Sequence, residues 1–289
     1  MSKDFSLDEI KKFWPEKAPD INIVQKYLKK YEKEKIVIKY GGNVLIDRNV
    51  FNNFISDINV LNKLGLSIIV VHGGGPRIKR ELDKKKIVSK FINGLRITDK
   101  NIINTVEEVL IDFNNDIVNS LKKLGSEAAS FHTKTDNIIK VKPERKELGF
   151  VGIPNEINDS LIQNALNKNK IPIIAPLGLG DHNQIYNING DTAASAIAKK
   201  LKSRRLILMT NVEGVYDDQK KLISEIKPFD LENLIKWKVV QGGMIPKIEN
   251  CVDAVQNGVR GVVILDGRKP HSVLHEIFSD KGSGTLIRE

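Results

Sequence analysis

The chain has 289 residues, 40% of them hydrophobic, which is enough for one large α/β domain or two lobes with a substantial core. Lys and Arg total 46 against 36 Asp and Glu, but the basic stretches are interleaved with acids, which indicates a solvated surface and not a nucleic-acid site. A single cysteine, Cys251, excludes a disulfide framework and a thiolate zinc cluster.

Targeting and metal signals are also missing from the sequence. No apolar run approaches twenty residues, and the N-terminus is too charged for a signal peptide, so we expect a cytoplasmic protein that binds no membrane. The histidines are scattered without a metal-ligand spacing, and we therefore predict no protein-held metal.

Two amphipathic segments, predicted to be surface helices, precede the first strand. Ser6 and Glu9 are spaced as a capping box at the start of the first segment. Four apolar or aromatic residues share one face of the second segment: Val24, Tyr27, Leu28 and Tyr31.

Short runs of aliphatic and β-branched residues follow as predicted strands: IVIKY (36–40), LSIIVVH (66–72), IPIIAP (171–176), RLILMT (205–210) and GVVIL (261–265). Segments of helical periodicity separate most of them, which predicts a mainly parallel sheet covered on both faces. Residues 131–158 break this rhythm with short alternating runs, and we expect hairpins there that project from an N-terminal lobe. The rhythm then resumes, which places a lobe boundary near residue 175.

Three glycine-rich turns adjoin predicted elements: Gly41 and Gly42, then Gly73, Gly74 and Gly75, then Gly242 and Gly243. Glycine allows the backbone to approach a ligand closely, and a helix start offers free N–H groups to phosphate. The motifs G-x-x-x-x-G-K-[ST] and G-x-G-x-x-G are absent, so a different phosphate-binding architecture is predicted.

Two lysines lie beside these turns. Lys39 ends a predicted strand directly before a glycine pair, where it either contacts phosphate or extends to solvent. Lys247 lies in the first turn of a helix that begins near Pro246, where the helix dipole disfavours a cation by about 0.3–1 kcal/mol. A bound polyanion would reverse that preference, and the alternative is an exposed lysine that is tolerated there.

Other polar residues allow two interpretations each. Asp191 precedes a predicted helix, so it is either a simple N-cap or a carboxylate that holds both lysines. Asn187 and Asn189 could donate amides to a substrate carboxylate or close the turn. Arg96 could bind a carboxylate through two parallel hydrogen bonds, or form a surface salt bridge to Asp99.

Taken in order, segments spanning about residues 25–287 closely resemble the N-acetyl-L-glutamate kinases of the amino acid kinase family: IVIKYGGNVL, VVHGGGPRI, NGLRITD, LGFVGIPNEIN, IPIIAPLGLG, YNINGDTAASAIA, LILMTNVEGVY, QGGMIPKIENCVDAVQNGV and GSGTLI. The combination of GLR-x-TD with N-x-N-x-D and GGM-x-x-K separates these kinases from most relatives that share only the first glycine turn.

The resemblance implies an α/β fold, a three-layer αβα sandwich with a central open sheet and an N-terminal helical extension. It implies three regions: an extension over residues 1–32, an N-acetylglutamate lobe over 33–175 and an ATP lobe over 176–289. The implied reaction transfers the γ-phosphoryl group of ATP to the side-chain carboxylate of N-acetyl-L-glutamate, the second step of arginine biosynthesis. Mg²⁺ should arrive with ATP, held mainly by phosphates and water.

The resemblance also assigns roles to individual residues. Lys39 and Lys247 match lysines that stabilise the transferring phosphoryl group, and Asp191 matches the carboxylate that organises them. Backbone contacts to the phosphoryl group fall on Gly41, Gly42 and Gly73, and acceptor contacts fall on Gly74, Gly75, Arg96 and Asn187. ATP contacts fall on two stretches: Asn211, Val212, Glu213, Gly214, Val215 and Tyr216, and Val239, Val240, Gln241, Gly242, Gly243 and Met244.

The N-terminal helix and the C-terminal segment resemble the arginine-inhibited branch, whose N-terminal helices interlace dimers into hexamers. Tyr27, Glu276 and Gly284 would then belong to an arginine site. The chain would be a homo-oligomer, a dimer or a hexamer built as a trimer of dimers. The alternative is a helix that packs on its own subunit.

The chain departs from the family pattern in three places. Gly190 stands where alanine is usual, Asn211 stands where aspartate is usual, and SFHTKTD replaces a GLxGKDG run. Other interpretations of the sequence are a kinase for N-acetylaminoadipate or carrier-linked glutamate, and a catalytically silent arginine-sensing subunit.

Overall fold

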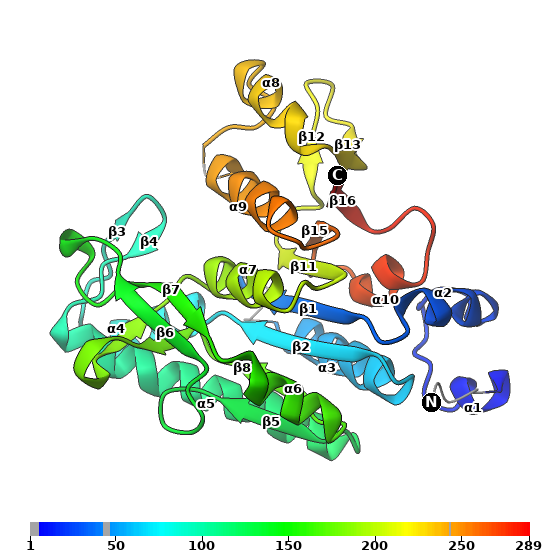
Figure 1. Ribbon diagram of the computed structural model, residues 1–289, viewed down its shortest axis with the longest axis horizontal. Coiled ribbons are helices and arrows are strands. Elements are labelled where there is room, and N and C mark those ends of the chain that lie inside the picture. The colour runs from blue at the N-terminus through cyan, green and yellow to red at the C-terminus, as the bar shows by residue number, and fades with distance from the viewer. Residues whose placement is uncertain (1–5, 43–46, 243) are drawn as a thin grey trace.

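The computed structural model describes residues 6–42, 47–242 and 244–289, and its centre is an eight-stranded sheet (Figure 1). From one edge to the other the strands are β14 (Glu225–Ile226), β16 (Gly284–Ile287), β15 (Val262–Asp266), β11 (Arg205–Thr210), β1 (Lys35–Tyr40), β2 (Ser67–His72), β8 (Ile171–Ile174) and β5 (Ala128–Phe131). Neighbouring strands are parallel except β15 and β16, so the predicted mainly parallel sheet is confirmed.

Helices cover both faces of this sheet. One layer consists of α1 (Leu7–Lys11), α2 (Val24–Tyr31), α3 (Arg48–Lys63), α5 (Lys100–Lys123) and α10 (Ser272–Ile277). The opposite layer consists of α6 (Asp159–Asn167), α7 (Gly190–Lys200) and α9 (Met244–Gln256). Because strand side chains alternate, Ile36 and Ile38 of β1 pack on the first layer and Val37 packs on the second. The expected three-layer αβα sandwich is therefore confirmed.

A smaller sheet, in the order β10-β9-β6-β7, lies beside the main one. Its strands are β6 (Ile139–Pro143), β7 (Gly152–Ile157), β9 (Leu177–Leu179) and β10 (Ile185–Asn187). The β6–β7 pair is antiparallel, which confirms a hairpin within residues 131–158. Strand β9 lies after the expected lobe boundary near residue 175, and it pairs with β6, which lies before that boundary. The small sheet therefore contains strands from both expected lobes, and the division into lobes stays a prediction.

The remaining elements are short, apart from α4 (Gly75–Lys84). They are the strands β3 (Phe91–Ile92), β4 (Leu95–Arg96), β12 (Val215–Tyr216) and β13 (Leu222–Ile223), the helix α8 (Leu231–Lys236), and 3-10 turns at Ile21–Ile23, Lys146–Leu148, Asp181–Asn183 and Pro228–Asp230. The β3–β4 and β12–β13 pairs form hairpins that project from the body of the molecule (Figure 1). Within the described ranges, the chain contains no helix with the length and apolar character of a bilayer span.

The N-terminal helices pack on their own chain. Ser6 and Glu9 form both bonds of the predicted capping box at the start of α1. In α2, Tyr27 lies edge-on to Phe278 and donates a 2.6 Å hydrogen bond to Asp280, so α2 lies beside α10 (Figure 1). This is one of the two arrangements that the sequence left open, and the oligomeric state stays a prediction.

Candidate active site

Two of the three predicted glycine-rich turns meet at the carboxyl edge of the sheet. Strands β1 and β2 run parallel and end with Tyr40 paired to His72, so the glycines that follow each strand lie close together. Indeed, the N–H of Gly73 donates to the carbonyl of Tyr40 at 2.7 Å. In the sheet, β2 lies on one side of β1 and the later strand β11 lies on the other, so the strand order reverses direction at β1. Open α/β sheets bind ligands at such a topological switch point.

Alternation along β1 determines where Lys39 points. Lys39 shares its face with Val37, toward α7, and its Nζ lies 2.9 Å from Oδ1 of Asp191. A Cβ added to Gly41 would lie 2.3 Å from that Nζ, so glycine leaves room for the lysine beside the turn. A Cβ at Gly190 would lie 3.2 Å from Cε of Lys39, so this departure from the family pattern also makes room for the lysine.

Lys247 reaches the same carboxylate from another helix. It lies in the first turns of α9, and its Nζ donates to Oδ2 of Asp191. The side chains of Lys39, Asp191 and Lys247 are 11%, 17% and 20% exposed. Burial opposes ionisation of Asp191, but the two ammonium groups outweigh it and hold the pKa of this carboxyl well below its usual range. The structure thus brings these three predicted residues together as a partly buried cation–carboxylate–cation cluster.

The N-cap interpretation of Asp191 is wrong. Asn189 caps α7, because its Oδ1 accepts from the backbone N–H of Asp191 at 2.9 Å and from that of Thr192 at 3.1 Å. Since Asn189 fulfils that role, the carboxylate of Asp191 is left for the lysines.

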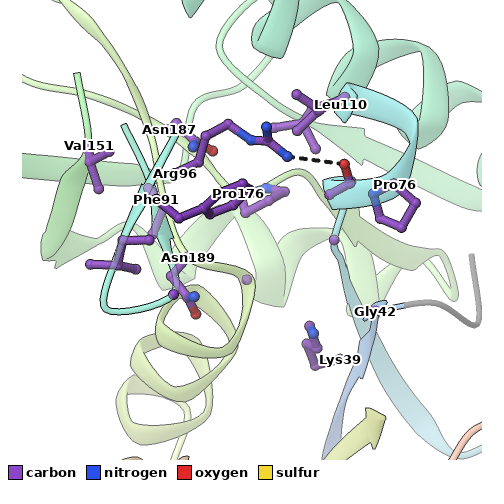
Figure 2. Close-up of a pocket in the computed structure, with 18 residues that line it drawn as sticks. Lys39, Gly42, Pro76, Phe91, Arg96, Leu110, Val151, Pro176, Asn187 and Asn189 are labelled. Carbon is purple, nitrogen blue, oxygen red and sulfur yellow. Dashed lines mark hydrogen bonds between the residues drawn. The ribbon is translucent and has the colours of Figure 1, made fainter. Parts of the chain in front are cut away.

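A pocket of about 180 Å³ opens beside the cluster (Figure 2). Lys39 and Arg96 approach it from different sides. Arg96 is only 8% exposed. Its guanidinium donates to the carbonyl of Gly75 at 3.2 Å and to Ser89, and lies 4.7 Å from the centre of the Phe91 ring. Burial lowers the pKa of Arg96. No carboxylate within the described residues forms a salt bridge with this guanidinium, which is therefore available to a ligand carboxylate.

The salt bridge from Arg96 to Asp99 that the sequence left open is not formed. Asp99 instead caps α5, accepting from the backbone N–H of Asn101 and Ile102 at 2.8 and 3.0 Å. Asn187 also lines the pocket, and its Nδ2 donates to the Thr98 hydroxyl at 3.3 Å.

Several pocket residues were not predicted from the sequence. They include Phe91, Leu110, Val151 and Pro176. Each is an apolar residue of a kind that also fills cores, so type and spacing gave no signal. Phe91 alone is mostly exposed, at 55%, despite its aromatic ring.

The predicted ATP residues lie on two neighbouring segments of the C-terminal half. Residues 211–216 follow β11 and residues 239–242 precede α9, while Gly243 lies outside the described residues. Val215 and Val240 are buried in the core beneath α9, so only their backbone could face a nucleotide. Glu213 forms a 2.8 Å ion pair with Lys269. Nucleotide contact by these segments stays a prediction.

The residues of the expected arginine site surround the loop that follows α10. Glu276 is buried, which raises the pKa of its carboxyl, and it accepts from the backbone N–H of Ser283 at 2.9 Å. Tyr27 bonds to Asp280 in the same loop. Gly284 lines an adjacent pocket, and a Cβ there would lie 2.0 Å from the Ile264 carbonyl.

The active-site pocket offers no evident metal cage. Within residues 6–42, 47–242 and 244–289, no three His, Cys, Asp or Glu side chains gather closely enough to hold a metal ion. Both oxygens of Asp191 face lysines.

Sequence and structure comparisons define the relationships of the chain. It is 53% identical over 282 residues to acetylglutamate kinase from Pelagibacter ubique, with 98% of each chain covered. It is 43% identical to acetylglutamate kinase from Clostridioides difficile, with 95% of this chain and 98% of that protein covered. Its fold matches N-acetylglutamate synthase from Neisseria gonorrhoeae with a TM-score of 0.84 at 20% identity, over 93% of this chain and 62% of that longer one. The model of the amino acid kinase family matches residues 34–266, and the chain belongs to that family.

Proposed function

We propose that this protein transfers the γ-phosphoryl group of ATP to the side-chain carboxylate of N-acetyl-L-glutamate, forming an acyl phosphate in arginine biosynthesis. The observation that carries the proposal is the convergence of Lys39 and Lys247 on Asp191 beside a pocket that contains Arg96. The 53% identity to an acetylglutamate kinase supports the same substrate pair.

The cluster suits phosphoryl transfer because that reaction requires positioning and charge neutralisation more than covalent help. Lys39 lines the pocket, where it would contact the attacking carboxylate, and Lys247 extends from α9, where it would contact the nucleotide phosphates. Asp191 holds both ammonium groups in place without accepting a proton, because its pKa is depressed. The acceptor is an ionised carboxylate at neutral pH, so no general base is needed.

The acceptor would lie in the pocket between the glycine turn and Arg96. The guanidinium would bind the α-carboxylate through parallel hydrogen bonds, and the Asn187 amide would assist. The apolar wall, which includes Leu110 and Val151, would contact the methylene and acetyl groups.

Mg²⁺ belongs to the proposal as a companion of ATP. It would sit on phosphate oxygens and water and neutralise charge there. Asp191 is engaged with the two lysines, so its role is to position them.

A chemical trapping assay with several acceptors tests the proposed function. Acyl phosphate formed from ATP and N-acetylglutamate is trapped with hydroxylamine, with N-acetylaminoadipate and a carrier-linked glutamate as competing acceptors. The proposal expects the highest kcat/KM for N-acetylglutamate. Preference for another acceptor would reassign the substrate, and no product with any acceptor would favour a silent arginine-sensing subunit.

Regulation and assembly extend the proposal. Arginine would bind near Tyr27, Glu276 and Gly284, where its guanidinium would stabilise the ionised form of the buried Glu276 carboxyl, whose pKa is raised by burial. The lobes would divide near residue 175, with the acceptor on the first and ATP on the second. A homodimer or hexamer and a cytoplasmic location complete the proposal, and sedimentation with and without arginine tests the assembly.

A further inference from the structure

A chain of buried hydrogen bonds connects the second glycine turn to the helix behind it. His72, the last residue of β2, is 0% exposed. The side-chain amide of Asn114 on α5 donates to the Ile173 carbonyl at 3.0 Å and lies 3.2 Å from Nε2 of His72. The Asn114 oxygen accepts from the Ser130 hydroxyl at 2.6 Å.

These contacts define the tautomer of His72. The Asn114 nitrogen must face the Ile173 carbonyl, since a carbonyl only accepts, and the same NH₂ group therefore donates to Nε2 of His72. Nε2 is then the acceptor, and the ring proton lies on Nδ1, which donates to the Gly73 carbonyl at 2.9 Å. Burial lowers the pKa of His72 to about 4, so the ring is neutral at pH 7.

The orientation of one peptide plane follows from this bond. In a trans peptide the C=O of one residue and the N–H of the next point in opposite directions. With the Gly73 carbonyl turned toward the buried His72, the N–H of Gly74 points away from His72, and Gly74 is one of the residues that line the pocket. No protein acceptor for that N–H occurs in the part of the chain that the structure describes. The N–H of the preceding residue, Gly73, donates to the carbonyl of Tyr40.

The glycine turn that carries this N–H lies beside Lys39. A Cβ at Gly190 would be 3.7 Å from Cα of Gly73 and 3.2 Å from Cε of Lys39, so the turn and the lysine border the same space. A fixed N–H donor aimed there would bind negative charge that develops on the transferring group.

From these contacts we infer that His72 is a positioning residue: its Nδ1–H holds the Gly73 carbonyl and thereby aims the Gly74 N–H at the phosphoryl group. The inference deepens the proposed function and rests on it. His72 is not a catalytic base, because both ring nitrogens are engaged and the ring has no exposed surface.

Kinetics of paired substitutions test the inference. His72→Leu removes the donor and should lower kcat about 10–100-fold while both KM values stay within about threefold, since the lost contact matters most in the transition state. His72→Asn places an amide N–H near the position of Nδ1 and should recover kcat to within about threefold of the wild type. Ser130→Ala removes a bond to the same Asn114 but leaves the His72–Gly73 bond, so its kcat should stay unchanged. Equal losses in all three variants, or full activity in His72→Leu, would overturn the inference.

Nuclear magnetic resonance on the wild type provides a test that needs no turnover. Long-range ¹H–¹⁵N correlations should show the Nδ1–H tautomer of His72 at pH 7, and inorganic phosphate should shift the Gly74 amide resonance. An Nε2–H tautomer or an unresponsive Gly74 would overturn the inference. If the wild type forms no acyl phosphate yet shows both signals, the proposed function fails while the positioning of Gly74 stands.

Discussion

Replacing Lys247 with methionine isolates the charge at one end of the cluster. Methionine is unbranched like lysine, so the aliphatic path along α9 is kept while the ammonium is lost. Lys247 donates to Asp191, and its side chain is 20% exposed, so its charge acts in a partly desolvated site.

The substitution should affect turnover, acceptor binding and stability to different extents. Removal of one preorganised charge partner lowers kcat by about 10²–10³-fold, or about 2.7–4 kcal/mol in the transition state. The KM for N-acetylglutamate should change less than about threefold, because Arg96 and Asn187 line the acceptor pocket and Lys247 does not. Stability should fall by only about 1–2 kcal/mol, because Asp191 keeps Lys39 at 2.9 Å.

The assay measures hydroxamate formation over both substrate concentrations, together with thermal melting. Lys199→Met is a matched control, because Lys199 forms a 2.6 Å ion pair with Asp253 that joins the same two helices, α7 and α9, away from the pocket. Its kcat should equal that of the wild type. An unchanged kcat in Lys247→Met, with a raised KM, would refute the reasoning.

Further predictions concern the neighbouring residues. Arg96→Ala should raise the KM for N-acetylglutamate at least about tenfold, and Arg96→Lys should not restore it, because a single ammonium cannot form two parallel hydrogen bonds. Saturation kinetics measure this effect, and a loss confined to kcat would contradict the prediction. Gly41→Ala should lower kcat, because the new Cβ would lie 2.3 Å from the Lys39 nitrogen. Gly75→Ala should change kcat less, because a Cβ there meets no atom within 4 Å. Equal losses of kcat in the two variants would count against this steric argument. Asp191→Asn should destabilise the protein by about 3–5 kcal/mol at pH 7. Since the folded pKa of Asp191 is lowered, its stabilisation is fully present above the unfolded value of about 3.9 and is lost as the pH falls through the folded pKa. The melting difference between Asp191→Asn and the wild type should therefore stay constant from pH 5 to 8, and a difference that varies there would exclude this origin.

Local patterns predicted the elements that carry the site. The capping-box spacing of Ser6 and Glu9, the aliphatic strands and the glycine turns each arise from interactions between residues close in sequence. Among the described residues, the structure contains the capping box, the strands and the turns that follow β1 and β2. Alternation in β1 also fixes that Lys39 and Val37 share a face.

The roles of individual side chains were harder to predict, because neighbouring residues can take the same role. From the sequence, Asp191 was considered as the N-cap of α7 and Asn189 was not, although both side chains can form such a cap. The packing of α7 against β1 decides, because it brings Asp191 to Lys39 and leaves the capping position to Asn189. Similarly, Val215 and Val240 occur in glycine-rich stretches typical of ligand contacts, yet both are buried in the core.

By itself, the sequence determined the strands, the helices, the glycine turns and the residue types available for phosphate chemistry. Only the tertiary structure decided that Lys39 from β1 and Lys247 from α9 meet on Asp191 from α7, and that His72 turns its proton toward Gly73. The physical reason is that periodicity specifies which face a residue occupies, whereas contacts between distant segments depend on how the layers pack. Burial and the pKa shifts it causes arise only once those layers are in place.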